Sequence, residues 1–399
     1  MDRAAQLISE LDADPAVTAG RWASGGSRSE DVHWPDFLVL ALQHRVPGLA
    51  LDALREIGWF GRVSLSITDD LARRATSARL RQQELEAAIG ELYDREPEVV
   101  SRCVLFKGAN LYGYYRKPEH RLMSDFDLLM SDDDHAALAP RFAELGYWIK
   151  NSLNGPTYFR RKPGAVAQLC IDAHICGPAK YSRPAEALSA EWLTDSLPAP
   201  ANGLPCRYMS PDLQALNLLA HSHEHAASWI HAVLDDDIRL IRALDLEVLC
   251  ARSTVSADDV WRRARRFGLA AEVALGVWLQ VQIRGALPVG LTPLEPLADT
   301  VAEFGETFAA PAGAVSRWST KVTDRIFRTD RIELAFADLG LHGSAADWLK
   351  YFDMEQQVLI GPREEVEKIA AAARDRVPDD PAHVDGGRSA AVAPGHTAS

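Results

Sequence analysis

Residues 104–127 read VLFKGANLYGYYRKPEHRLMSDFD, and this stretch decides the fold of the chain. Its apolar start predicts a strand at Val104–Phe106, and the Lys107-Gly108 pair predicts a turn that leads into a helix at Ala109–Tyr115. Glycine in such a turn lets the backbone approach a phosphate group, and a helix N-terminus attracts an anion. The first half of the stretch therefore predicts a phosphate-binding turn.

The second half of the stretch contributes two carboxylates. Asp125 and Asp127 belong to a short buried strand that we expect around Phe126–Met130, and side chains two residues apart on a strand point to the same face. A later strand is predicted at Ala167–Ile175, where Asp172 lies on the face opposite to the apolar residues. The pattern therefore predicts three acidic side chains close together on one sheet.

Three carboxylates beside a glycine turn favour nucleotidyl transfer. That reaction needs a neutralised, oriented triphosphate and an activated acceptor, which divalent ions held by carboxylates provide. Mg²⁺ prefers oxygen ligands, so we expect Asp125, Asp127 and Asp172 to be catalytic and metal-binding, Mg²⁺ to be the cofactor, and an NTP, by default ATP, to be the substrate. The candidates for nucleotide contact surround the carboxylates: Lys107, Gly108, Ala109, Arg121, Ser124 and His174.

The composition is that of an ordinary globular protein, with 399 residues, 47% hydrophobic and 25% charged. The net charge of −13 argues against a long nucleic-acid-binding face, so nucleic acid is not an expected partner. No apolar run is long enough to cross a membrane, and the charged N-terminus lacks a secretory segment, so we expect a cytoplasmic location. Five scattered cysteines without a C-x-x-C pair predict neither disulfides nor a thiolate zinc site.

The order of the predicted elements gives an α+β fold, in which a small α/β unit with a mixed sheet lies between helical regions. We expect N-terminal helices over residues 1–98, a catalytic domain over 99–183, a larger helical acceptor-binding domain over 184–376 and a disordered tail over 377–399. Two further strands are expected at Tyr147–Lys150 and Tyr158–Arg161. Apolar spacing predicts helices at Asp36–Glu56, Ser66–Leu92, Asp132–Gly146, Pro211–Ser228, Val233–Cys250, Ser256–Phe267, Ala270–Arg284, Trp318–Ala335 and Pro362–Arg376.

The catalytic stretch resembles the polymerase-β-like nucleotidyltransferase superfamily, and more closely an uncharacterised bacterial nucleotidyltransferase branch of it. The matching motifs are Phe106–Ala109 (FKGA), Tyr112, Arg121–Asp127 (RLMSDFD), Leu145–Tyr147 (LGY) and, more loosely, Asp172–Ile175 (DAHI). The resemblance runs from about residue 104 to 284. The superfamily signature has Gly-Gly or Gly-Ser in the turn, whereas this chain has Gly-Ala.

The resemblance implies a polymerase-β-like catalytic domain that moves a nucleoside monophosphate from an NTP to a hydroxyl or phosphate acceptor and releases pyrophosphate. It implies that Asp125, Asp127 and Asp172 are magnesium ligands, that Asp172 is the general base, and that the Gly108 turn holds the triphosphate. The acceptor would be a small metabolite, a peptide or a protein.

Two other hypotheses about the function stay open. His221, Glu224 and His225 fit the H-x-x-E-H pattern of a zinc-dependent hydrolase, with Glu247 as a conceivable third ligand. The same histidines would also suit the wall of a cleft between the α/β unit and the helical domain. A catalytically inactive nucleotidyltransferase fold that serves as a binding module is the second alternative. The acidic triplet at 235–237 is interpreted as a solvated turn.

Overall fold

The computed structural model describes residues 3–26, 28–105, 107–111, 113–152, 155–161, 169–176, 191–199, 203–310, 315–341 and 362–383. The predicted strand residue Phe106, the motif residue Tyr112 and the last part of the predicted tail, 384–399, lie outside the described residues.

A mixed seven-stranded sheet forms the centre of the α/β unit, in the order β3-β4-β5-β2-β1-β7-β6. Strand β2 pairs in parallel with β5 and antiparallel with β1, while β1 pairs in parallel with β7. The strands are β1 (Val104–Leu105), β2 (Phe126–Ser131), β3 (Trp148–Ser152), β4 (Gly155–Arg160), β5 (Leu169–Cys176), β6 (Ser196–Leu197) and β7 (Arg207–Met209). The predicted α+β fold with a mixed sheet is confirmed.

The two faces of this sheet have different neighbours because side chains alternate along each strand. Leu128 and Ile171 face a core made with the second half of α5 (Leu65–Tyr93) and with α7 (Asp132–Glu144). Helix α7 begins where Ser131 Oγ accepts a hydrogen bond from the amide of Asp134 at 3.1 Å. The opposite face of β2 and β5 carries Asp127, Asp172 and His174, and its Leu129 packs in the apolar cluster formed with the helical part of the molecule.

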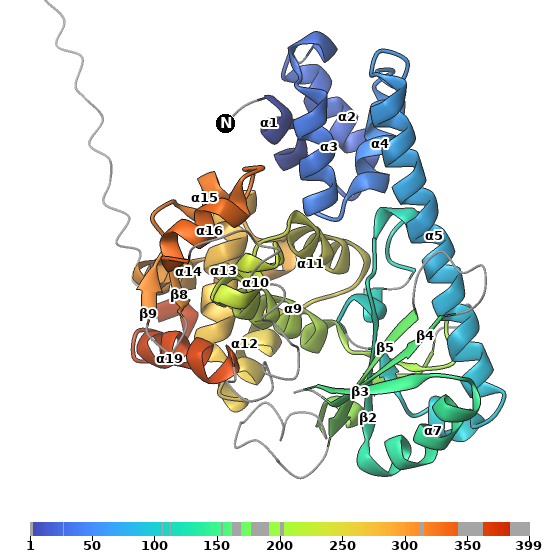
Figure 1. The fold of residues 1–399 in the computed structure, drawn as a ribbon. Helices are drawn as coiled ribbons and strands as arrows, with labels where there is room; N and C mark the ends of the chain where they lie inside the picture. Colours follow the sequence, from blue (N-terminus) through green and yellow to red (C-terminus); the bar gives the residue numbers. More distant parts are fainter. Residues whose placement is uncertain are drawn as a thin grey trace, which may run out of the picture.

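The N-terminal helices pack at one end of α5, as Figure 1 shows for the blue segments above the sheet. They are α1 (Arg3–Ser9), α2 (Pro15–Ser24), η1 (Ser29–Asp31), α3 (Trp34–Gln43) and α4 (Pro47–Glu56), and α6 (Pro97–Val100) follows α5. The predicted single helix over 36–56 is therefore two helices. Arg45 has a left-handed backbone (φ 59°) and Pro47 starts the next helix, so the chain turns between them.

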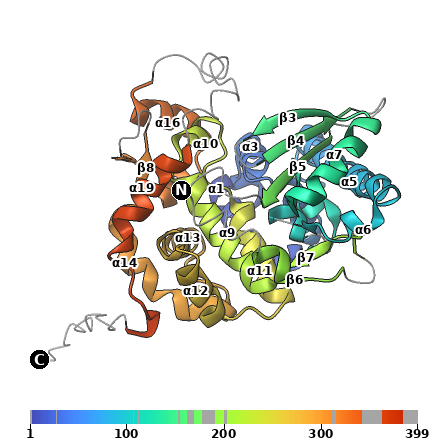
Figure 2. The ribbon, with the colours of Figure 1, turned by 90° about the horizontal axis from the view of Figure 1, so that it is seen from below.

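The C-terminal helices form a bundle around α13, and α9 and α11 lie between this bundle and the sheet (Figure 2). Gly276 of α13 permits close packing, because a Cβ there would collide with the carbonyl of Leu219 in α9. The elements are α9 (Pro211–Ala226), α10 (Trp229–Val233), α11 (Leu240–Arg252), α12 (Ala257–Arg266), α13 (Ala270–Arg284), η4 (Val289–Leu294), α14 (Pro296–Gly305), β8 (Thr307–Ala309), β9 (Val315–Arg317), α15 (Val322–Arg325), α16 (Arg331–Leu339), α19 (Pro362–Arg374) and η6 (Pro381–His383).

Three other predicted elements were wrong in detail. The helix expected at 233–250 starts only at Leu240, because the acidic triplet forms a turn after α10. The helix expected at 318–335 is two short helices, α15 and α16. The tail expected to be disordered from residue 377 is ordered at its start, where Trp261 Nε1 donates to the carbonyl of Asp379 at 3.1 Å.

The hydrophobic core is continuous between the N-terminal and C-terminal helices. One cluster includes Leu40 of α3, Val104 of β1, Leu129 of β2 and Leu244 of α11. The polar face of the sheet therefore lies against both helical regions, and side chains from either region can contribute to a site there.

Candidate functional site

Sheet pairing brings the three predicted carboxylates together. Asp127 of β2 and Asp172 of β5 are direct register partners on parallel strands, so their side chains share one face. Asp125 precedes β2 by one residue and contributes a third negative charge that acts on Asp172. Leu128 and Ile171 point into the core on the other face, and for Ile171 the alternation in the sequence predicted this.

Asp127 is the most strongly stabilised of these carboxylates. Its Oδ1 accepts hydrogen bonds from Lys107 Nζ at 3.0 Å and from His174 Nε2 at 2.7 Å. Burial works to raise the pKa of Asp127, but the charge of Lys107 and the His174 contact outweigh it and lower the pKa. Gln214 Nε2 donates to the carbonyl of Lys107 at 2.9 Å and so fixes the left-handed backbone (φ 47°) from which this lysine extends.

The other two carboxylates repel their neighbours. Burial and the charge of Asp127 raise the pKa of Asp125. Burial, Asp127 and Asp125 raise the pKa of Asp172. Ser124 Oγ donates to Asp125 Oδ1 at 3.1 Å, and Lys107 attracts both acids. Lys107 lies among all three acids and Arg45 acts on Asp125, yet the pKa values of Asp125 and Asp172 stay raised, so these two carboxylates favour an additional cation.

The donor chemistry at this site fits Mg²⁺, since all three acids offer carboxylate oxygens. Within the described ranges no three acidic, histidine or cysteine side chains converge closely enough to hold a metal ion as they stand. The groups that contact Asp127 are the ammonium of Lys107 and the ring of His174. Asp125, Asp127 and Asp172 are thus a set of possible ligands whose charges are partly satisfied by the protein itself.

The turn after β1 differs from the prediction. Residues Lys107–Leu111 form the short 3-10 helix η2 rather than the start of an α-helix, because Gly108 and Asn110 are poor helix formers. Ala109 is buried in the hydrophobic core. The open side of Gly108 is covered by Arg121, whose Nη2 lies 2.7 Å from the position that a Cβ at residue 108 would take. Within Lys107–Leu111, the described part of this turn, no α-helix begins.

Arg121 contacts another residue as well as Gly108. Its guanidinium forms a bidentate ion pair with Asp245 of α11, with Nε–Oδ1 and Nη2–Oδ2 distances of 2.9 Å. Tyr115 Oη donates to the same carboxylate at 2.7 Å. Burial opposes the charge of Arg121, but Asp245 raises its pKa. Arg121 thus forms an ion pair between the α/β unit and α11, and its contact with a phosphate stays a prediction.

The sequence analysis missed a cationic cluster beside the carboxylates. Arg45, from the end of α3, donates through Nη1 to Ser124 Oγ at 2.9 Å. Arg239 and Arg242 both pair with Asp236, at 3.0 and 2.7 Å. These residues come from segments far apart in the sequence and belong to no motif, so only the fold brings them together. The one local signal was the acidic triplet that contains Asp236, which is a partly buried part of the site rather than a solvated turn.

The histidines lie at this cationic cluster. The rings of His221 and His225 are 4.2 Å apart between centroids, and those of His225 and His231 are 3.7 Å apart. Burial and the charge of Arg242 lower the pKa of His225, and Arg242 Nη2 donates to its Nδ1 at 2.7 Å. Glu247, the conceivable third zinc ligand, instead pairs with Arg284 at 2.7 Å. The positive charge of Arg242 and the Glu247–Arg284 pair do not favour the zinc arrangement.

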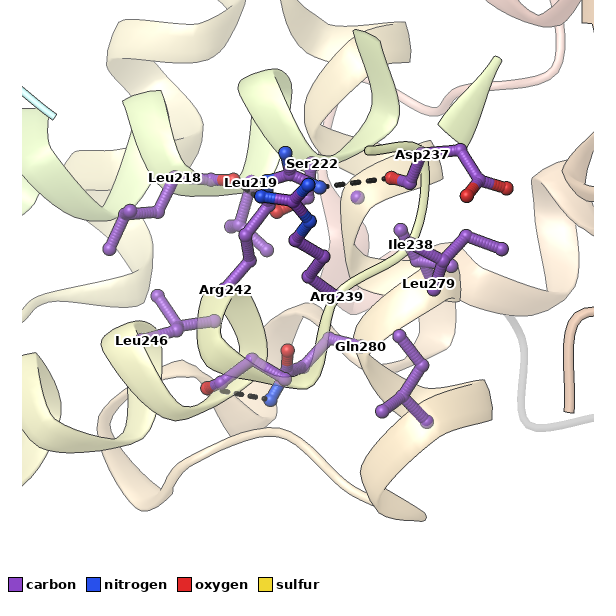
Figure 3. Close-up of a pocket in the computed structure, with 13 residues that line it drawn as sticks. Leu218, Leu219, Ser222, Asp237, Ile238, Arg239, Arg242, Leu246, Leu279 and Gln280 are labelled. Carbon is purple, nitrogen blue, oxygen red and sulfur yellow. Dashed lines mark hydrogen bonds between the residues drawn. The ribbon is translucent and has the colours of Figure 1, made fainter. Parts of the chain in front are cut away.

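A small cavity lies beside the same arginines, between α9, α11 and α13 (Figure 3). Its volume is about 10 Å³, which is room for roughly one water molecule. Arg242 Nη1 donates to the carbonyl of Asp237 at 3.0 Å at its edge, and Gln280 donates to the carbonyl of Ala243 across from it. This cavity is too small for a nucleotide.

Comparison with known proteins identifies the family of the chain. A family model described as an uncharacterised nucleotidyltransferase matches residues 30–285, which is well over half of the chain. No match was found among curated proteins or among solved structures. Among the described residues, no helix is long and apolar enough to span a membrane. The match includes the carboxylate strands, the N-terminal helix α3 and the helices through α13, and the chain therefore belongs to this family of nucleotidyltransferases.

Proposed function

We propose that this enzyme transfers a nucleoside monophosphate from an NTP to a hydroxyl or phosphate group of an acceptor and releases pyrophosphate, with Mg²⁺ as the cofactor. The observation that carries the proposal is the register pairing of Asp127 with Asp172, with Asp125 beside them, on a sheet face that looks toward basic side chains. The family membership of the chain agrees with this chemistry.

Asp125, Asp127 and Asp172 would hold Mg²⁺, which when bound neutralises the triphosphate and stabilises the negative charge that develops during transfer. The acceptor oxygen forms the new bond to the α-phosphorus while the bond from that phosphorus to the β-phosphate oxygen breaks. Asp172 takes the proton of a hydroxyl acceptor. Its raised pKa suits that role, because a base works best when its pKa approaches the working pH.

Lys107 would change partners when the nucleotide binds. Its ammonium contacts Asp127 and neutralises this carboxylate. With a metal ion bound at Asp127, the positive charge of Lys107 would no longer be needed there. The Lys107 ammonium could then donate a hydrogen bond to a phosphate oxygen. We propose ATP as the first NTP to test and a small metabolite, a peptide or a protein as the acceptor.

The proposal is tested by isothermal titration of each of the four common NTPs, in Mg²⁺ and again in EDTA. Wild type is expected to bind at least one NTP in Mg²⁺ only, and Asp127→Asn is expected to lose that binding. A wild type that binds no NTP in Mg²⁺, or an Asp127→Asn variant that binds as wild type does, would contradict the proposed function.

A further inference from the structure

Three residues other than glycine have a left-handed backbone in the described part of the chain. They are Arg45 (φ 59°), Lys107 (φ 47°) and Asp235 (φ 55°). Such conformations are uncommon outside glycine, and they persist where a side chain is needed at that position. Lys107 contacts Asp127, Arg45 contacts Ser124, and Asp235 directly precedes Asp236. Arg45 and Lys107 therefore contact residues of the candidate site, where backbone strain is typical of function, whereas the side chain of Asp235 pairs with Arg331.

Arg45 occupies a position that usually takes glycine. It follows the C-cap of α3, His44, and the residue after a helix C-cap commonly adopts the left-handed conformation that glycine tolerates best. An arginine at this position orients its guanidinium away from α3 and onto Ser124, next to Asp125. The backbone conformation thus directs a cation toward the carboxylates.

The guanidinium of Arg45 uses little of its binding capacity. It has five N–H donors, and among the described residues it makes one hydrogen bond, to Ser124, and no ion pair within 4 Å. Burial lowers the pKa of Arg45, and Arg242 and Arg121 add to this effect, although Asp236 and Asp125 oppose it. The arginine is therefore a partly buried cation with four of its five N–H donors unused among the described residues, and an anion would engage these donors.

The neighbouring arginines share a single carboxylate. Arg239 and Arg242 both pair with Asp236, and Arg242 also donates to His225. Burial lowers the pKa of His221 and of His225, which keeps these rings neutral. Three guanidinium groups, those of Arg45, Arg239 and Arg242, thus surround Asp236, and Asp125 is the other acid that acts on Arg45. Planar guanidinium groups suit two-point binding of phosphate oxygens.

We propose that Arg45, with Arg242 beside it, binds the terminal phosphates of the NTP. This inference rests on the proposed function and names the residues that grip the triphosphate. Because Arg121 covers the Gly108 turn, the terminal phosphates would instead be bound by Arg45, which follows α3, and by Arg242 of α11. The family match begins at residue 30 and so includes α3 and Arg45.

The test is isothermal titration of the full chain with inorganic tripolyphosphate and Mg²⁺, a probe that does not depend on the base. Arg45→Gly is expected to weaken binding at least tenfold, while its unfolding temperature is no lower than that of wild type because glycine suits φ 59°. Arg45→Lys, which keeps the charge but not the fork of donors, is expected to show an intermediate loss. Arg55→Ala is the control, since it removes the same charge from a half-exposed position in α4.

The outcomes separate the two proposals. If Arg45→Gly, Arg45→Lys and Arg55→Ala all bind as wild type does, the role of Arg45 is overturned and the proposed function stands. If wild type binds an NTP but not tripolyphosphate, the proposed binding of the terminal phosphates by Arg45 and Arg242 is likewise overturned. If wild type binds neither, both proposals fall. Equal weakening by Arg45→Gly and Arg55→Ala would show a general charge effect and would also contradict the inference.

Discussion

Asp127 and Asp172 are register partners on adjacent parallel strands, yet their environments shift their acidities in opposite directions. Lys107 and His174 overcome the effect of burial and lower the pKa of Asp127. Burial and the two neighbouring acids raise the pKa of Asp172. Ionised Asp127 therefore stabilises the fold, whereas ionised Asp172 destabilises it.

This opposition predicts opposite effects on stability for two variants that both lose function. Asp172→Asn should raise the free energy of unfolding by about 1 kcal/mol at neutral pH, because it removes a repelled charge. Asp127→Asn should lower it by roughly 2 kcal/mol, because it breaks charged hydrogen bonds to Lys107 and His174. Urea denaturation without metal measures both values. A shift of the same sign in the two variants would contradict this account of the site.

Gly108 should be required for packing rather than for contact with phosphate. Gly108→Ala would push against the guanidinium of Arg121, which Asp245 holds in place, and should lower the free energy of unfolding by roughly 2 kcal/mol. Gly90→Ala in α5 is the control, since nothing lies within 4 Å of its added Cβ. That variant should gain about 1 kcal/mol from helix propensity. Thermal denaturation of the two variants decides the matter, and an unchanged stability of Gly108→Ala would refute the packing role.

The Arg121–Asp245 pair should be among the most important polar contacts between the α/β unit and α11. Asp245 is 1% exposed, so Asp245→Asn leaves a buried arginine without its counterion and should cost about 3–5 kcal/mol. Tyr115→Phe removes one hydrogen bond and should cost about 1 kcal/mol. Arg116→Ala breaks only an exposed ion pair with Asp14 and should cost less than about 1 kcal/mol. Denaturant titrations in which these three variants do not follow this order would count against the interpretation.

Stability should fall in mild acid because of buried histidines. Burial lowers the pKa of His223 to about 4, whereas an unfolded histidine titrates near 6.5. Between pH 4 and 6.5 the unfolded state therefore binds more protons than the folded state. As far as His223 is concerned, the free energy of unfolding has its full value above pH 6.5 and decreases as the pH falls toward 4. His223→Gln should reduce the slope of unfolding free energy against pH by up to about 1.4 kcal/mol per pH unit in this window. Urea titrations at pH 7, 6 and 5 measure the slope, and an unchanged slope would show that His223 is not buried as a neutral ring.

The sequence predicted the parts of the site that depend on local pattern. Alternation along the strands placed Asp127 and Asp172 on one face, and it did so because one face of each strand must be apolar. The pattern failed for the turn after β1, where spacing alone could not reveal that Arg121 would cover Gly108. The partner of Arg121, Asp245, lies 124 residues further along the chain and becomes a neighbour only through tertiary packing.

The cationic half of the site could not be predicted for the same reason. Arg45 and Arg242 lie on different helical regions, and each reads in the sequence as an ordinary charge on an amphipathic helix. The positive φ of Arg45, which directs its side chain toward Ser124, also has no signature in the sequence, because glycine is the residue that normally marks such a position.

The most direct test of the central claim is an electron paramagnetic resonance titration of Mn²⁺, which accepts the same oxygen ligands as Mg²⁺. It would be performed on wild type, Asp125→Asn and Asp127→Asn with an NTP present. We predict that wild type binds Mn²⁺ together with the NTP and that both variants lose the protein-bound signal. Equal Mn²⁺ binding by wild type and the two variants would contradict a metal-nucleotide site at these carboxylates.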